Sequence, residues 1–84
     1  MDTPVQAFDV RFNETPGGPL LVRGMEAFAL NEISLAMWRL CDGYHTEQDI
    51  TREIAGQFAA DPGQVSADVT EFLTALRRAR LVEG

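Results

Sequence analysis

Residues 25–43 read MEAFALNEISLAMWRLCDG, and in this stretch the spacing of the apolar residues changes from that of a strand to that of a helix. From Met25 to Leu30 apolar residues alternate weakly with others, which predicts a short strand. Asn31 is a residue type that caps helix N-termini, and Asp42-Gly43 predicts the end of that helix. The expected apolar stripe of the helix is Ile33, Ala36, Met37, Leu40 and Cys41.

The residues before this stretch predict two more strands. Residues 7–13 alternate, with Phe8, Val10 and Phe12 on one face. Pro16-Gly17-Gly18-Pro19 predicts a turn, and the apolar run Leu20-Leu21-Val22 after it predicts a strand that stops at Arg23-Gly24. With the run from Met25 to Leu30, these form a three-stranded antiparallel sheet, which needs a helical layer on one face.

Two further helices follow. Thr46 with Asp49 approximates a capping box for the first, whose apolar residues are Ile50, Ile54 and Phe58. Asp61 caps the second, Pro62 fits its first position, and Gln64 can reach back to the cap. Its stripe is Val65, Val69, Phe72, Leu73 and Leu76, and Leu81-Val82 closes the chain.

This order predicts an α+β fold of the winged-helix kind, with a three-stranded antiparallel sheet followed by three helices. The 84 residues suffice for one small domain, 1–84, in which we expect residues 1–6 to be flexible. A domain of this size rarely encloses an active site. It more often binds a partner along its outside.

Composition and charge narrow the function further. Thirteen acidic residues against seven basic ones give a net charge of −6, which disfavours binding to nucleic acid. No apolar run approaches the roughly 18 residues of a membrane span, and Met1-Asp2-Thr3-Pro4 has no signal-peptide character. A single cysteine fits a reducing compartment. We therefore expect a cytoplasmic protein without a membrane partner.

The chain offers little for catalysis. His45 precedes the second predicted helix, where we expect a solvated turn histidine, and Cys41 is expected to be a small buried thiol. One histidine and one cysteine cannot supply the three or four ligands of a zinc site. The sequence therefore predicts no catalytic residue, no metal and no cofactor, and a protein that is not an enzyme.

The sheet edge is the remaining candidate site. A short strand such as Met25–Leu30 has unpaired backbone groups, to which an extended peptide can add as a strand. On a helical wheel one flank of the third helix places Asp68, Phe72, Ala75 and Ala79 together. Two alanines leave room for a ligand, Phe72 offers an apolar wall and Asp68 could hold a donor. The alternative is that Phe72 is simply core and Asp68 simply solvated.

The sequence resembles the PqqD-like family, also called RiPP recognition elements, which hold the leader of a ribosomally made precursor peptide for tailoring enzymes. The resemblance extends over nearly the whole chain beyond Phe8. The matching residues are Leu30-Asn31, Leu40-Cys41-Asp42-Gly43, Thr46 to Ile50, Phe58, Asp68-Val69-x-x-Phe72-Leu73-x-x-Leu76 and Leu81. Arg80 departs from the family, which often has glycine before its last apolar residue.

The resemblance implies a non-catalytic peptide chaperone. The leader would add to the third strand and lie against the third helix. The implied binding residues are Glu26, Ala27, Phe28, Ala29 and Leu30 for backbone pairing, and Asp68, Phe72 and Ala75 for the groove wall, where Ala79 shares the flank. The implied partner is a modifying enzyme, whether a radical SAM enzyme, a leader peptidase or a cyclodehydratase. An open edge also permits a homodimer.

Two alternatives stay open. A winged-helix DNA-binding or regulatory domain would need its basic end, Arg77, Arg78 and Arg80, to face phosphate, although these residues also complement a helix dipole. A structural adaptor would only dimerise through the exposed edge.

Overall fold

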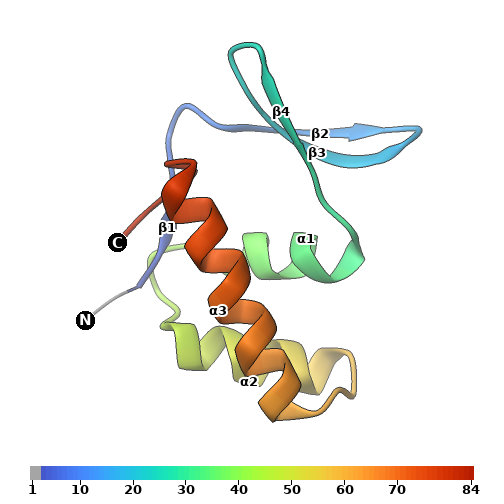
Figure 1. The fold of residues 1–84 in the computed structure, drawn as a ribbon, viewed down its shortest axis with the longest axis vertical. Helices are drawn as coiled ribbons and strands as arrows, with labels where there is room; N and C mark the ends of the chain where they lie inside the picture. Colours follow the sequence, from blue (N-terminus) through green and yellow to red (C-terminus); the bar gives the residue numbers. More distant parts are fainter. Residues whose placement is uncertain (1–2) are drawn as a thin grey trace.

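The computed structural model describes residues 3–84 and places a three-stranded sheet above a group of three helices in the view of Figure 1. The antiparallel sheet has the strand order β2-β3-β4, and a separate pair of short strands joins the two ends of the chain. The predicted α+β fold is confirmed. The elements are β1 (Val5–Gln6), β2 (Arg11–Thr15), β3 (Gly18–Arg23), β4 (Glu26–Ala29), α1 (Glu32–Arg39), α2 (Glu47–Gln57), α3 (Pro62–Arg78) and β5 (Val82–Glu83).

Side chains cap all three helices at the predicted residues. The Asn31 side chain accepts a hydrogen bond from the Ser34 N–H, and the Ser34 hydroxyl accepts one from the Asn31 N–H, each at 2.8 Å. Thr46 and Asp49 form the same reciprocal pair at the start of α2. Asp61 caps α3 by accepting from the Gln64 N–H at 3.0 Å. The expected return of the Gln64 side chain to the cap is not made, because its amide donates to Asp68 instead.

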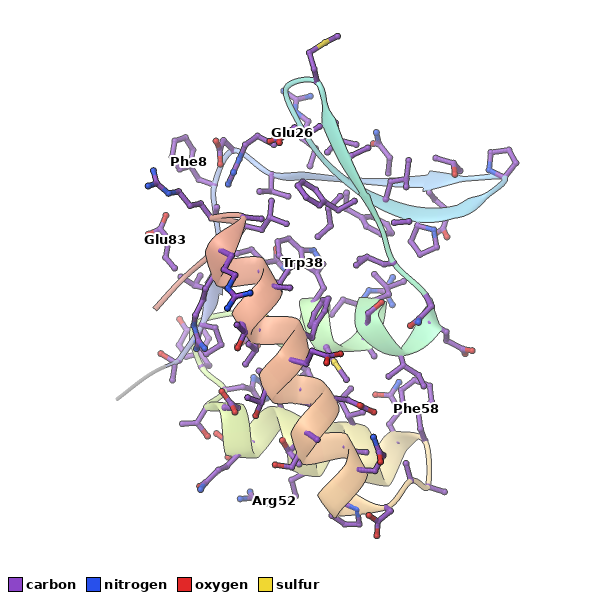
Figure 2. The ribbon with its side chains drawn as sticks, in the orientation of Figure 1. Phe8, Glu26, Trp38, Arg52, Phe58 and Glu83 are labelled. Atoms are coloured by element: carbon purple, nitrogen blue, oxygen red, sulfur yellow. The ribbon has the colours of Figure 1, made fainter. Side chains whose placement is uncertain are left out.

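The core lies where the helices meet, and it includes residues from β3 and β5. Trp38 is only 4% exposed and is enclosed near the middle of the molecule in Figure 2, although the predicted stripe of α1 omitted it. Ile33, by contrast, was predicted to be buried and is 43% exposed. It lies in the first turn of α1, beyond the reach of the core. The core residues are Leu21, Met37, Trp38, Cys41, Ile50, Ile54, Val65, Val69, Leu73, Leu76, Leu81 and Val82.

The first predicted strand is displaced along the sequence. The Val10 N–H donates to the Ala7 carbonyl at 3.2 Å, which makes a turn of residues 7–10, so β2 starts only at Arg11. Phe8 is consequently 95% exposed and shares no face with Phe12. The prediction of a strand over residues 7–13 was therefore wrong in its first half.

The N-terminal segment pairs with the C-terminus of the chain. Val5 is opposite Glu83 and Gln6 is opposite Val82, and the Ala7 N–H donates to the Leu81 carbonyl at 2.9 Å. Of the segment expected to be flexible, residues 1–2 lie outside the described residues, whereas residues 5–6 form β1. In residues 3–84, no helix has both the length and the apolar character to span a membrane.

Arg23 attaches the sheet to the helices. Leu21 is the only buried residue of β2, β3 and β4, so the sheet contributes little core of its own. The Arg23 guanidinium donates to the Ala79 carbonyl at 2.9 Å and to the Arg80 carbonyl, which are at the C-terminal end of α3. Its Nε also lies 3.2 Å from the carboxylate of Asp9. One side chain therefore connects β3, the turn of residues 7–10 and the end of α3.

Arg23→Met keeps the apolar stem and removes these charged hydrogen bonds, leaving the last carbonyls of α3 without this donor. We expect the free energy of unfolding to fall by about 2 kcal/mol, measured by urea denaturation. Arg11→Met is the matched control on β2, where the exposed Arg11 side chain makes no hydrogen bond or ion pair with any other residue of 3–84. Equal losses for the two variants would contradict the anchoring role.

Two helices end on a residue in the left-handed region that is not glycine. Ala59, with φ 51°, follows the cap of α2, and Arg80, with φ 59°, follows the cap of α3. The next residue closes the helix in each case: Ala60 N–H donates to the Ala55 carbonyl at 3.0 Å, and Leu81 N–H to the Leu76 carbonyl at 2.8 Å. This geometry is that of the Schellman motif, which favours glycine at the left-handed position.

Ala59→Gly should therefore stabilise the protein by about 0.5–1 kcal/mol, because glycine adopts this conformation without a steric penalty. The melting temperature would rise by several degrees. The control, Ala67→Gly at an exposed position inside α3, should lower the free energy of unfolding by about 1 kcal/mol. A decrease for both variants would contradict the left-handed conformation of Ala59.

Candidate functional site

The outer edge of β4 is the first part of the site. β4 is at one end of the β2-β3-β4 sheet, and among residues 3–84 its only partner strand is β3. The Leu30 N–H donates to the Pro19 carbonyl at 2.9 Å, and the register continues with Phe28 opposite Leu21. Because antiparallel residues alternate in the direction of their backbone groups, Ala27 and Ala29 direct theirs away from β3.

The five residues predicted for backbone pairing thus divide into two sets. Glu26, Phe28 and Leu30 direct their backbone groups to β3, whereas Ala27 and Ala29 leave an N–H and a carbonyl each at the open edge. Both alanines are exposed, and their methyl side chains leave the surface beside the edge unobstructed. This edge can accept an added strand through two residues.

The α3 helix comes close to both ends of β4. Near the start of β4, Arg23 binds the Ala79 carbonyl at the end of α3. Beyond the end of β4, Asn31 lies with Asp68 and Phe72 around one pocket. Figure 1 shows α3 rising from beside α2 to the level of the sheet, where it ends next to β1. Members of the helix flank predicted from the wheel therefore lie near the two ends of β4: Ala79 near its start, and Asp68 and Phe72 beyond its end.

An open pocket of about 250 Å³ lies between the start of α1 and the middle of α3. Since Asn31 follows Leu30 directly, the pocket opens just past the end of β4. It includes two of the predicted residues, Asp68 and Phe72, whereas Ala75 and Ala79 lie outside it. The lining residues are Asn31, Ile33, Ser34, Met37, Asp68, Glu71 and Phe72.

The α1 side of the pocket was missed by the sequence analysis, which placed Ile33 and Met37 on the core stripe. Phe72 matches both readings of the sequence, because it is half-buried against the core and also lines the pocket. Asp68 is exposed, and within residues 3–84 its carboxylate accepts one hydrogen bond, from the Gln64 amide at 3.1 Å. The sequence held no signal for this side of the site, because the apolar side chain of Ile33 fits a core stripe as well as an exposed wall.

The reactive side chains lie elsewhere. Cys41 is fully buried, and burial, with a smaller effect of Asp42, raises the pKa of its thiol to about 12. The predicted buried thiol is confirmed, and the thiolate needed for nucleophilic chemistry is strongly disfavoured. Among residues 3–84, no group of three or more His, Cys, Asp or Glu side chains is arranged to hold a metal ion.

His45 is paired rather than simply solvated. Its Nδ1 lies 2.9 Å from a carboxylate oxygen of Asp42, and this hydrogen bond raises the pKa of the imidazole. Slight burial opposes ionisation of Asp42, but the hydrogen bonds from His45 and from the Tyr44 N–H outweigh it and lower the pKa of the carboxyl. The hydrogen bond between His45 and Asp42 holds together the loop between α1 and α2, and neither residue lines the pocket.

The fold has close relatives among solved structures. The solution structure of the PqqD truncation of Methylobacterium extorquens PqqCD, described as a stand-alone RiPP recognition element, superposes with a TM-score of 0.81 at 26% identity, covering 99% of this chain and 90% of that one. PqqD from Xanthomonas campestris gives a TM-score of 0.68 at 25% identity, with coverages of 99% and 94%. A lasso peptide synthetase B1 complexed with the leader peptide superposes with a TM-score of 0.78 at 20% identity, covering 99% of this chain and 100% of that one. This similarity shows a common fold.

The sequence comparisons agree. The bifunctional coenzyme PQQ synthesis protein C/D of Methylorubrum extorquens is 28% identical over 74 residues, which are 88% of this chain but only 20% of that protein. The chain thus spans about a fifth of this relative. The family model of coenzyme PQQ synthesis protein D matches residues 20–82, from β3 to β5. On that match, together with the fold, this chain belongs to the PqqD family.

Proposed function

We propose that this protein is a non-catalytic recognition element that binds the leader of a ribosomally synthesised precursor peptide and delivers it to a modifying enzyme. The observation that carries the proposal is the open edge of β4 at Ala27 and Ala29, with α3 near both ends of the strand and a pocket beyond its end. An extended peptide needs just these features: backbone partners for affinity and a recess for a side chain.

The leader would bind as a fourth strand of the sheet. Its backbone would pair with Ala27 and Ala29, and the residues beyond Leu30 would enter the pocket between α1 and α3. The Asp68, Phe72, Ala75 and Ala79 flank would form the second wall of the groove. The shared fold with a synthetase bound to its leader peptide supports this arrangement.

Delivery would act by raising the effective concentration of the precursor at the enzyme. A recognition element that holds the leader and docks on an enzyme makes the encounter of precursor and active site effectively intramolecular. The fusion of a PqqD segment to a second synthesis protein in one relative supports action beside an enzyme. For a PqqD-family member the proposed partner is a radical SAM enzyme; a leader peptidase or a cyclodehydratase are the counterparts in other pathways.

The DNA-binding alternative gains no support from the basic end of α3. Arg77 donates to the Gly84 carbonyl at 3.1 Å and lies 3.9 Å from Glu47, so it is engaged within the protein. A second copy of the chain could pair with the β4 edge, and such a homodimer would compete with the leader for Ala27 and Ala29.

Ala29→Pro should abolish leader binding, because proline removes an outward N–H without removing a hydrogen bond to β3. The probe is a fluorescein-labelled peptide from the N-terminal half of a short reading frame encoded beside this gene, titrated by fluorescence anisotropy. We expect at least a tenfold rise in Kd. Phe28→Pro is less informative, because the Phe28 N–H faces β3.

The matched control is Glu14→Pro, which places proline at an outward position on the opposite edge of the sheet, on β2. It should leave the Kd within about twofold. Binding should also lose little affinity between two salt concentrations, unlike phosphate contacts. If the folded Ala29→Pro variant binds the peptide as well as the wild type does, the site lies away from β4. If the protein binds duplex DNA in place of the peptide, and this binding weakens steeply with salt, the proposed function is overturned.

A further inference from the structure

The pocket beyond β4 combines an apolar floor with an acidic rim. Ile33, Met37 and Phe72 provide the apolar lining, and Asp68 and Glu71 provide two carboxylates one helical turn apart on α3. A cavity of about 150 Å³ is enough to hold benzene. The 250 Å³ available here therefore holds one long side chain.

On the α1 side, the side-chain oxygens of Asn31 and Ser34 are engaged within the protein. Asn31 and Ser34 bind each other in the capping box. On the α3 side, the Gln64 amide donates to Oδ1 of Asp68, and this is the only hydrogen bond that the two carboxylates accept from residues 3–84. The rim thus offers free carboxylate oxygens to a ligand.

No positively charged side chain of the protein lines this pocket. Three of the arginines form ion pairs elsewhere: Arg23 with Asp9, Arg52 with Asp49 and Arg77 with Glu47. The two carboxylates are therefore left without a cationic partner from the described part of the chain.

We propose that this pocket selects a lysine or arginine side chain of the bound peptide, just beyond the segment that pairs with β4. The inference rests on the proposed function and specifies the ligand at the same site. The aliphatic stem of such a side chain packs against Ile33, Met37 and Phe72 while its charged group reaches the carboxylates. A plain apolar side chain would fill the floor but leave the rim unpaired, and an acidic one would be repelled.

A random 12-residue peptide library displayed on phage tests this selection directly. We expect peptides selected on the wild-type protein to share a lysine or arginine at one fixed position. Selection on Asp68→Asn/Glu71→Gln should lose that preference. The control, Glu53→Gln/Glu83→Gln, changes the net charge by the same amount at exposed residues outside the pocket and should keep it.

A double-mutant cycle then assigns the preference to the pocket. The probe is a selected peptide labelled with fluorescein. A second labelled peptide has the same sequence, except that methionine replaces the shared basic residue. Replacing either the basic residue or the two carboxylates should weaken binding roughly five- to tenfold, and replacing both should cost little more, because one interaction is lost in each case. Circular dichroism and a thermal melt check that the variants remain folded.

The outcomes separate the two claims. Suppose that the selected peptides bind and that Ala29→Pro abolishes their binding. If they then share no basic residue, or if the losses in the cycle are additive, the pocket's selectivity is overturned while the strand-addition function stays intact. Failure to select any peptide that depends on Ala29 would overturn the proposed function and the inference with it.

Discussion

Burial of one face of α3 is the interaction on which the rest of the structure depends. Val65, Val69, Leu73 and Leu76 are all buried, and they form the centre of a core to which the sheet contributes one fully buried residue, Leu21, and the half-buried Phe28. The sheet is therefore positioned by the helices, through Leu21 and the Arg23 contact with the end of α3. With its anchor on β3, the sheet leaves the outer edge of β4 unpaired among residues 3–84, and α3 lies near both ends of that strand.

This arrangement explains how so small a chain can offer the proposed binding site without an enclosed cavity. The same helix that forms the core also presents Phe72 and Asp68 on its flank, where they meet the start of α1. β4 leads directly into α1 through Leu30 and Asn31. In the proposed complex, backbone pairing at β4 and side-chain recognition in the pocket would follow one another along the bound peptide.

The local features of the fold were predictable from sequence because they depend on neighbouring residues. Asn31, Thr46 and Asp61 cap the helices as their residue types and spacing indicate, and the α3 stripe is buried as its period predicts. The pairing of β1 with β5 was missed, because it joins the two ends of the chain without a local pattern. Ile33 was assigned to the core because periodicity shows which face of a helix is apolar, but not how far along the helix the core extends. No local sequence pattern indicates the pocket, because it combines residues of α1 and α3.

Amide hydrogen exchange followed by NMR tests the central claim most directly, because it observes the edge residues themselves. The protein labelled with ¹⁵N is compared with and without the leader peptide encoded beside its gene. Strand addition at β4 predicts that exchange slows at the amides of Ala27 and Ala29 and stays unchanged at Phe12 and Glu14, which face outward on β2. Slowed exchange at the outer edge of β2 or along α2, with Ala27 and Ala29 unaffected by the bound peptide, would contradict it.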